Sequence, residues 1–327
     1  MAIGIWWTMF KLNNPPVKSF IHFLRLVRWP NLLFILLAES LFHFFIYKPL
    51  YPNLALTADY SFYFIVATSI CIAAAGYIIN DYFDVNIDQV NKPKSVVVGA
   101  HISRRWVIFW HLFLSMGGVY ISLIAFPFQQ YIHVHFSNLA TILILWFYST
   151  NFKRDFLIGN VVIAVLTAWT IGVVYFSKFT ITQLTHPTNM QSADLRFLKL
   201  MILYSSFAFI LTLIREALKD MEDMDGDGKF GCKTMPIAWG LQTTKVYVAV
   251  WLMVLILVLS IIQLYAIPFG WWISIIYCIV TIITPLVYVL FNLKQAYTRA
   301  NFNQLSNFIK FAMLMGILSM GFFYFLL

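Results

Sequence analysis

The sequence predicts an all-α membrane protein in which nine transmembrane helices form a single bundle. Two observations carry this prediction. Hydrophobic residues make up 61% of the 327 residues and charged residues only 11%, whereas soluble domains have roughly 25% charged residues. In addition, the apolar residues are gathered in runs of about 20, the length that an α-helix needs to cross a bilayer. We therefore expect an integral, multi-pass membrane protein without a large soluble domain.

Nine apolar runs have the length of a membrane span. In chain order they cover residues 31–48, 61–80, 105–127, 131–149, 157–177, 197–217, 245–266, 271–292 and 306–327. Residues 1–30 come before the first span. Their apolar start lacks a charged leading segment and is followed by Pro15 and Pro16, so we interpret them as a cytoplasmic or interfacial lead-in rather than a cleaved signal peptide. Residues 31–327 then form the nine-helix domain.

The basic residues predict the orientation of these spans. Most of the 22 Lys and Arg residues lie before residue 31 or in connections that fall on the same side, namely 81–105, 150–156, 215–245 and 293–305. Lys310, just inside the last span, lies nearest that side, whereas Lys48, Lys178, Arg196 and Lys199 fall opposite. Because cytoplasmic loops are enriched in Lys and Arg, we expect a cytoplasmic N-terminus. The net charge of +9 is explained by this topology and by attraction to anionic lipid, and no nucleic-acid partner is expected.

Two acidic clusters end the second and the sixth span, on the side expected to be cytoplasmic. They read Asn80-Asp81-x-x-Asp84-x-x-x-Asp88 and Asp220-x-x-Asp223-x-x-x-Asp227. Spacings of three and four place side chains on one face of a helix. Six of the chain's 13 acidic residues are in these two clusters, so the sequence predicts two carboxylate faces at one membrane boundary.

Carboxylate faces at a membrane boundary are costly unless a cation lies between them. Mg²⁺ takes hard oxygen ligands and is commonly shared between carboxylates and the phosphates of a substrate. We therefore predict that the clusters hold a diphosphate through Mg²⁺. The predicted metal ligands are Asn80, Asp81, Asp84, Asp88, Asp220, Asp223 and Asp227.

Three other interpretations of the acidic clusters are a solvated helix cap, a calcium-binding loop and the ion path of a transporter. A single acid at a helix end is usually a solvated cap, but two copies of the same spacing argue against this. The stretch from Asp223 to Gly228 resembles the start of an EF-hand loop, but Thr234 stands at its twelfth position, where that loop needs Glu. An ion or phosphate-compound transporter is a second functional class. It would place ionisable groups near the bilayer midplane rather than at helix ends.

At these residues the chain resembles the UbiA superfamily of intramembrane prenyltransferases, whose members share nine transmembrane helices and two aspartate-rich cytoplasmic motifs. Asn80, Asp84 and Asp88 match the first motif, and Asp223 and Asp227 match the second. Further matches are Arg28-Trp29-Pro30-Asn31, Asn91-Lys92-Pro93, Tyr148 to Lys153, and Gly159-Asn160. The stretches Lys219 to Asp227 and Gly231-x-Lys233-Thr234-x-Pro236 look most similar to the digeranylgeranylglyceryl phosphate synthase branch and to the homogentisate prenyltransferase branch.

The resemblance implies Mg²⁺-dependent transfer of a prenyl group from an allylic polyprenyl diphosphate. The acceptor would be the hydroxyl of geranylgeranylglyceryl phosphate or a similar glycerol phosphate, with an aromatic quinone precursor as the alternative. Aromatic residues are 18% of the chain and suit an apolar channel that shields a cationic carbon. If the protein is bacterial or archaeal, its expected location is the inner, cytoplasmic membrane. The active site is expected on the cytoplasmic side, and no obligate protein partner is expected.

The resemblance and the basic residues beside the motifs also imply a set of site residues. The catalytic residues would be Asp84, Asp88, Asp223, Asp227, Lys153 and Tyr148. The diphosphate-binding residues would be Asn31, Asn80, Lys92, Lys94, Lys153, Arg215, Lys219, Lys229 and Lys233. Two of these residues also suit simpler roles, since Asn31 could only cap a helix and Tyr148 could be an interfacial aromatic.

The segment from Asp225 to Met235 contains Gly226, Gly228 and Gly231. Glycine gives the backbone unusual freedom, so we expect this segment to be a mobile loop that closes over the bound diphosphate.

Overall fold

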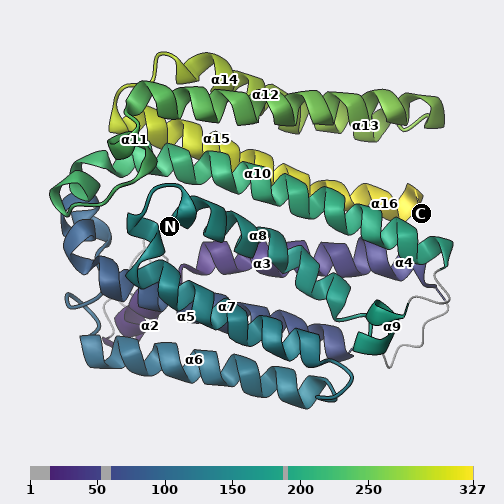
Figure 1. Ribbon diagram of the computed structural model, residues 1–327, viewed down its shortest axis with the longest axis horizontal. Helices are drawn as coiled ribbons and strands as arrows, with labels where there is room; N and C mark the ends of the chain where they lie inside the picture. The colour runs from purple at the N-terminus through teal and green to yellow at the C-terminus, as the bar shows by residue number, and fades with distance from the viewer. Residues whose placement is uncertain (1–14, 53–59, 187–190, 327) are drawn as a thin grey trace, which may run out of the picture.

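The computed structural model describes residues 15–52, 60–186 and 191–326, and within these ranges it is built from helices and short connections without a β-strand (Figure 1). Nine helices in the described ranges are long and apolar enough to cross a membrane. The predicted fold class and the number of spans are therefore confirmed, and the protein is an integral, multi-pass membrane protein.

The spans follow one another in the predicted order, some of them with a local change of helix type. They are Trp29–Leu50 (α3 Trp29–Leu41, π-helical η1 Phe42–Tyr47 and α4 Lys48–Leu50), α5 (Tyr60–Asn91), α6 (Arg104–Ala125), α7 (Ile132–Thr150), α8 (Ile158–Phe176), α10 (Ser192–Lys229), α12 (Leu241–Ala266), Trp272–Leu293 (α13 Trp272–Cys278, π-helical η6 Ile279–Ile283 and α14 Thr284–Leu293) and α15 (Arg299–Leu318, with helical turns to α16, Phe323–Leu326). Shorter helices are α2 (Pro15–Leu26), α9 (Ile181–Thr185) and α11 (Met235–Ala238).

Two of these helices are much longer than the predicted spans 61–80 and 197–217. With 32 and 38 residues, α5 and α10 are about 48 and 57 Å long at 1.5 Å per residue, against about 30 Å for the hydrocarbon core of a bilayer. The sequence-based bounds stop where the apolar run stops, but the backbone remains helical through the acidic residues. Both clusters therefore lie on helical extensions, with their acids on helix faces as the spacing predicted.

The expected mobile loop from Asp225 to Met235 is only partly a loop. Helix α10 continues through Gly226 and Gly228 to Lys229, and the chain leaves the helix only around Gly231, whose φ of 71° is left-handed. The low helix propensity of glycine is overridden here by a tertiary contact between Gly226 and Asn91. Whether the remaining turn closes over a ligand stays a prediction, as does the domain boundary at residue 30.

The long helices run side by side (Figure 1). Helix α5 packs against α3, α6 and α7, whereas α10 packs against α8, α12 and α15. The last turns of α5 and α10 lie at the same end of the bundle, on the left in Figure 1. A large buried cluster between α10, α12, α14 and α15, which includes Leu211, Leu252, Leu286 and Ile309, holds the second half of the bundle together.

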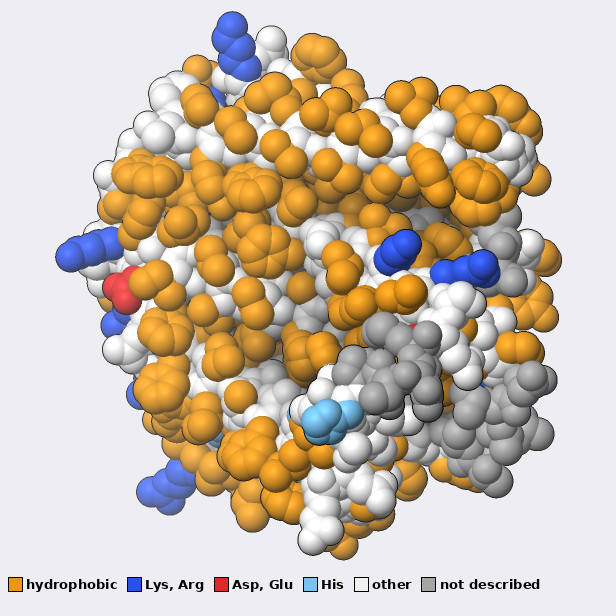
Figure 2. Space-filling view, turned by 45° about the vertical axis from the view of Figure 1, so that its right-hand side comes forward, with side chains coloured by type: hydrophobic (Ala, Val, Ile, Leu, Met, Phe, Trp, Pro, Cys, Tyr) orange, Lys and Arg blue, Asp and Glu red, His pale blue; other side chains and the backbone are white. Residues whose placement is uncertain are grey.

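Many large apolar side chains are on the outside of the bundle. Ile273 is 78% exposed, Phe291 75% and Ile261 55%, and hydrophobic side chains cover most of the face shown in Figure 2. A soluble monomer rarely exposes so continuous an apolar surface. Lipid therefore takes the place of water around these residues.

Candidate active site

The two acidic helix ends are joined directly. The backbone N–H of Gly226 in α10 donates to Oδ1 of Asn91, the last residue of α5, at 3.0 Å. Lys92, which follows α5, forms an ion pair with Asp223 of α10 at 2.6 Å. A Cβ on Gly226 would lie 2.3 Å from Asn91 Oδ1, so only glycine permits this approach. These contacts join residues that are separated by 131 and 135 positions in the sequence, so the two motifs lie next to each other.

In the first cluster, Asp81 and Asp84 form ion pairs with basic side chains. Asp81 pairs with Arg28 at 2.5 Å. Asp84 pairs with Lys153 and accepts a hydrogen bond from the Asn80 amide at 2.8 Å. Lys153 comes from the short 3₁₀ turn η4 (Phe152–Arg154) between α7 and α8. Burial lowers the pKa of Lys153 from its ordinary value, and Asp84 opposes this shift.

The second cluster has a similar arrangement. Asp223 contacts Arg299 of α15 at 3.3 Å in addition to Lys92, and Asp220 accepts a hydrogen bond from the Asn160 amide of α8 at 2.8 Å. The backbone N–H of Cys232 donates to the carbonyl of Asp227 at 3.0 Å, and burial raises the pKa of the Cys232 thiol, with Asp227 adding to the shift. The direct contacts Lys92–Asp223 and Asn91–Gly226 place the two clusters around a common space.

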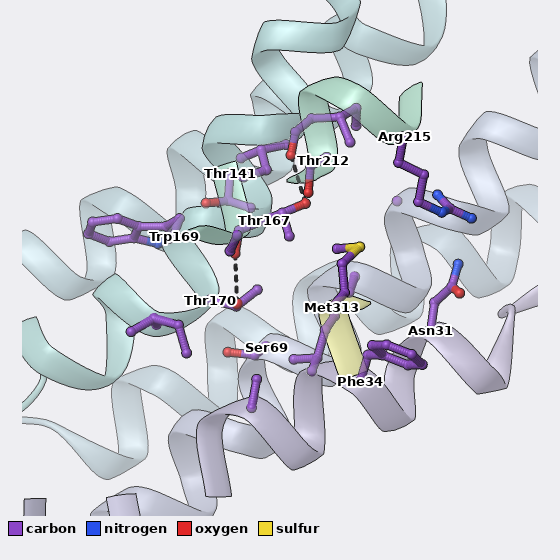
Figure 3. A pocket seen from close by; sticks show the side chains of 18 of the residues that line it. Asn31, Phe34, Ser69, Thr141, Thr167, Trp169, Thr170, Thr212, Arg215 and Met313 are labelled. Atoms are coloured by element: carbon purple, nitrogen blue, oxygen red, sulfur yellow. Dashed lines mark hydrogen bonds between the residues drawn. The ribbon is translucent and has the colours of Figure 1, made fainter. Parts of the chain in front are cut away.

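A cavity of about 280 Å³ opens among α3, α5, α7, α8, α10 and α15. Its charged and amide-bearing lining residues next to the acidic clusters are Arg28, Asn31, Asn80, Arg215, Glu216 and Lys219. Figure 3 shows Asn31 and Arg215 together on one side of the cavity and Trp169, Thr167 and Thr170 on the other. Much of the remaining lining is apolar, with hydroxyl groups of Ser69, Thr141 and Thr212 interspersed.

This geometry suits an amphiphilic ligand. The charged side chains at the mouth can bind a polyanion, and the interior between the helices can accept an apolar chain. Aromatic rings of Phe34, Tyr77 and Tyr148 line the cavity. Their π-faces can stabilise a cationic carbon that water does not reach.

The structure brings most of the predicted site residues together. Asn31, Asn80, Tyr148, Arg215 and Lys219 line the cavity. The ion pairs and hydrogen bonds of the two clusters are formed by Asp81, Asp84, Lys92, Lys153, Asp220 and Asp223. Asp88 and Asp227 are partly buried, one helical turn beyond Asp84 and Asp223 on the same helices.

Three predicted lysines are placed elsewhere. Lys94, Lys229 and Lys233 are exposed, and none of them lines the cavity. Their position in sequence next to the motifs does not bring their side chains to the cavity wall in this structure.

Sequence reasoning also missed several residues of the site. Arg28 and Asn160 belong to matched motifs but have no predicted role, and Glu216, Arg299 and Lys310 are absent from the predicted site. Glu216 pairs with Arg215 at 2.9 Å, and Lys310 lines the cavity from α15. A charged residue inside a membrane span, as at position 310, is the signal that could have found it.

Within the described residues, no three side chains of His, Cys, Asp or Glu converge closely enough to hold a metal ion on their own. Carboxylates of the two clusters instead form ion pairs with the side chains of Arg28, Lys92, Lys153 and Arg299. The hard oxygen donors that Mg²⁺ prefers are present, and Mg²⁺ is usually bound by one or two carboxylates together with substrate phosphates and water. The residues fit that mode of binding, in which the substrate completes the site.

A bundle of membrane spans with two facing acidic helix ends above a cavity defines an intramembrane enzyme for substrates with a charged head and an apolar tail. The chain belongs to the UbiA prenyltransferase family, whose model matches residues 31–325. Family membership favours an enzyme over the transporter alternative.

Known relatives agree with this assignment. A digeranylgeranylglyceryl phosphate synthase from Methanosphaera stadtmanae is 29% identical over 262 residues, which cover 79% of this chain and 86% of the relative. Among solved structures, a digeranylgeranylglyceryl phosphate synthase superposes with a TM-score of 0.59 at 21% identity, over 95% of this chain and all of the other. A UbiA homologue from Archaeoglobus fulgidus bound to DMAPP and Mg²⁺ has a TM-score of 0.55 at 17% identity, over 90% of this chain and 98% of the other.

Proposed function

We propose that this protein transfers a prenyl group from an allylic polyprenyl diphosphate, such as geranylgeranyl diphosphate, to the hydroxyl of a glycerol-phosphate lipid such as geranylgeranylglyceryl phosphate. The observation that carries the proposal is the pair of acidic helix ends, joined by Lys92–Asp223 and Asn91–Gly226, above a cavity between the helices. The synthase relative from Methanosphaera stadtmanae supports the choice of acceptor.

The residues that would hold Mg²⁺ are Asp84 and Asp88 on one side and Asp223 and Asp227 on the other. When bound there with the diphosphate, Mg²⁺ supplies charge neutralisation that makes the diphosphate a better leaving group. The A. fulgidus homologue bound to DMAPP and Mg²⁺ supports this part of the proposal.

The chain's own residues bind and orient the substrates. Lys153 pairs with Asp84 of the first cluster, and Lys92 pairs with Asp223 of the second. Their ammonium groups can therefore contact the diphosphate as it binds and stabilise the charge that it gains. Tyr148 and Tyr77 line the cavity and can exclude water from the allylic carbon.

The reaction exchanges one carbon–oxygen bond for another. The bond between the allylic carbon and the diphosphate oxygen breaks, and its electron pair leaves with the diphosphate. The acceptor oxygen forms the new ether bond to that carbon, and its proton passes to the released diphosphate. The bonds and charges therefore balance without a redox partner.

We further propose that the acidic end of the bundle faces the cytoplasm and that the protein resides in the inner membrane. The excess of Lys and Arg on the side of the clusters supports this orientation. The inner membrane is also where a cytoplasmic diphosphate and a lipid acceptor can meet.

The test is product analysis with purified protein, geranylgeranyl diphosphate and Mg²⁺. Mass spectrometry is expected to show a diether phosphate when geranylgeranylglyceryl phosphate is the acceptor, and no product when Mg²⁺ is chelated. Hydroxybenzoate, homogentisate and dihydroxynaphthoate serve as competing acceptors. Transfer to an aromatic acceptor alone would overturn the glycerol-phosphate assignment, and the absence of transfer to every acceptor would overturn prenyl transfer itself.

A further inference from the structure

Lys310 is a lysine inside a membrane span that faces the cavity. It follows Arg299 by 11 residues in α15, and therefore lies about 16 Å further along the helix axis. Arg299 contacts Asp223, and deeper in the bundle a Cβ on Gly316 would meet the Phe207 ring of α10 at 2.1 Å. These two contacts fix the register of α15 against α10 and place Lys310 well below the acidic clusters.

Helix geometry directs the Lys310 side chain toward the mouth of the cavity. Side chains in an α-helix point back toward its N-terminus, which in α15 is the end that carries Arg299. Arg215 lies about 12 Å from Asp223 along α10, on the same side of the clusters as Lys310. Both side chains line the same cavity.

No anion in the described part of the chain balances this lysine. None of its carboxylates lies within ion-pair distance of Lys310, and the one on Glu216 is shared by Arg215 at 2.9 Å and Lys219 at 3.9 Å. The Lys310 ammonium instead lies 5.2 Å from the centre of the Phe34 ring, a contact that offsets only part of the cost of desolvation. A charge inside a membrane span is costly and marks a functional site by default.

Building on the proposed function, we propose that Lys310 and Arg215 bind the phosphate of the acceptor lipid, and that Lys310 thereby selects phosphorylated acceptors. The donor's diphosphate is assigned to the acidic clusters, where Lys92 and Lys153 are found. The acceptor hydroxyl must reach the allylic carbon, and in a glycerol phosphate the phosphate is only a few bonds from that hydroxyl. The second anion therefore enters the cavity below the first, where the long side chains of Lys310 and Arg215 line the wall.

The experiment compares two acceptors that differ only in the phosphate, geranylgeranylglyceryl phosphate and geranylgeranylglycerol. Wild type is expected to prefer the phosphorylated acceptor in kcat/KM. In Lys310→Met this preference should fall by about 10- to 100-fold, the range for loss of one hydrogen bond to a charged group, while KM for geranylgeranyl diphosphate stays within about twofold of wild type. Lys310→Arg should restore most of the preference.

Lys199→Met is the matched control, because Lys199 is an exposed lysine of α10 outside the cavity, and it should behave as wild type. Removing a partly buried charge that has no carboxylate partner should leave the melting temperature of Lys310→Met equal to wild type or higher. Lys310→Gln provides a second neutral variant. An unchanged acceptor preference in both neutral variants, or a raised donor KM with an unchanged acceptor KM, would overturn the inference while the proposed function stands. Wild-type transfer only to an aromatic acceptor would overturn both.

Discussion

We expect the carboxylate of Asp84 and the ammonium of Lys153 to have different partners with and without substrate. Without substrate they neutralise each other in a largely buried pair, with 15% and 10% of their side chains exposed. In the proposed reaction, both are needed by other partners, the carboxylate for Mg²⁺ and the ammonium for diphosphate. Under this proposal, the same contact stabilises the empty site and supplies the groups that bind the substrate.

Asp84→Asn should separate these two roles. Activity should fall at least about 100-fold, the scale for losing one main electrostatic stabiliser of the transition state. Stability without ligand should fall by about 1–3 kcal/mol, because Lys153 loses its charged partner. Initial rates at limiting Mg²⁺ and a thermal melt in detergent measure the two effects.

Asp225→Asn is the matched control for this change. Asp225 is exposed between Asp223 and Asp227 on the same helix, so its replacement should leave rate and melting temperature close to wild type. Near-normal activity of Asp84→Asn at limiting Mg²⁺ would remove Asp84 from the metal site.

The helical extensions of α5 and α10 set the distance between the two acidic clusters. Each extension is one continuous helix with the membrane span before it, so the acids are placed by rigid elements rather than by loops. The hydrogen bond from Gly226 to Asn91 ties the two helix ends together at 3.0 Å. The spacing of the clusters therefore depends on a residue without a side chain.

Gly226→Ala should disrupt this junction. The added methyl group would overlap the Asn91 amide, and forcing the helices apart should cost about 1–3 kcal/mol and reduce kcat/KM. The control is Gly228→Ala, two residues further along the same helix, where a Cβ would meet nothing within 4 Å. That variant should keep wild-type activity and gain up to about 1 kcal/mol from helix propensity. Equal behaviour of the two variants in activity and melting assays would show that the junction has no special role.

At the scale of the whole molecule, the charge pattern predicts which end of the bundle meets the cytoplasm. Single cysteines at Gln89 and Asp225, both exposed beside the clusters, should react with an impermeant maleimide only from the cytoplasmic side of oriented vesicles. The spans α6, α7 and α8 lie between Gln89 and Thr182 of α9. Because three spans end on the side opposite to where they begin, a cysteine at Thr182 should react only from the opposite side. Labelling of positions 89 and 225 from different sides would refute the proposed arrangement.

Much of the fold could be read from the sequence because one physical constraint dominates it. The bilayer thickness sets the length of each apolar run, and helical spacing sets which acids share a face. The nine spans and the two carboxylate faces of Asp84 and Asp223 follow from those rules alone. Their continuation as helix beyond the apolar runs does not, since hydropathy cannot distinguish a polar helix from a loop.

The composition of the cavity wall depended on packing. Lys94, Lys229 and Lys233 adjoin the motifs in sequence but point to the exterior, whereas Arg299 and Lys310 come from a helix that begins 76 residues beyond Asp223 and reach the site. Which side of α15 meets α10 is set by side-chain fit, such as Gly316 against Phe207, and one sequence does not reveal that fit. Residue type and spacing thus specify the chemistry of each helix face, but helix packing selects the faces that meet around the substrate.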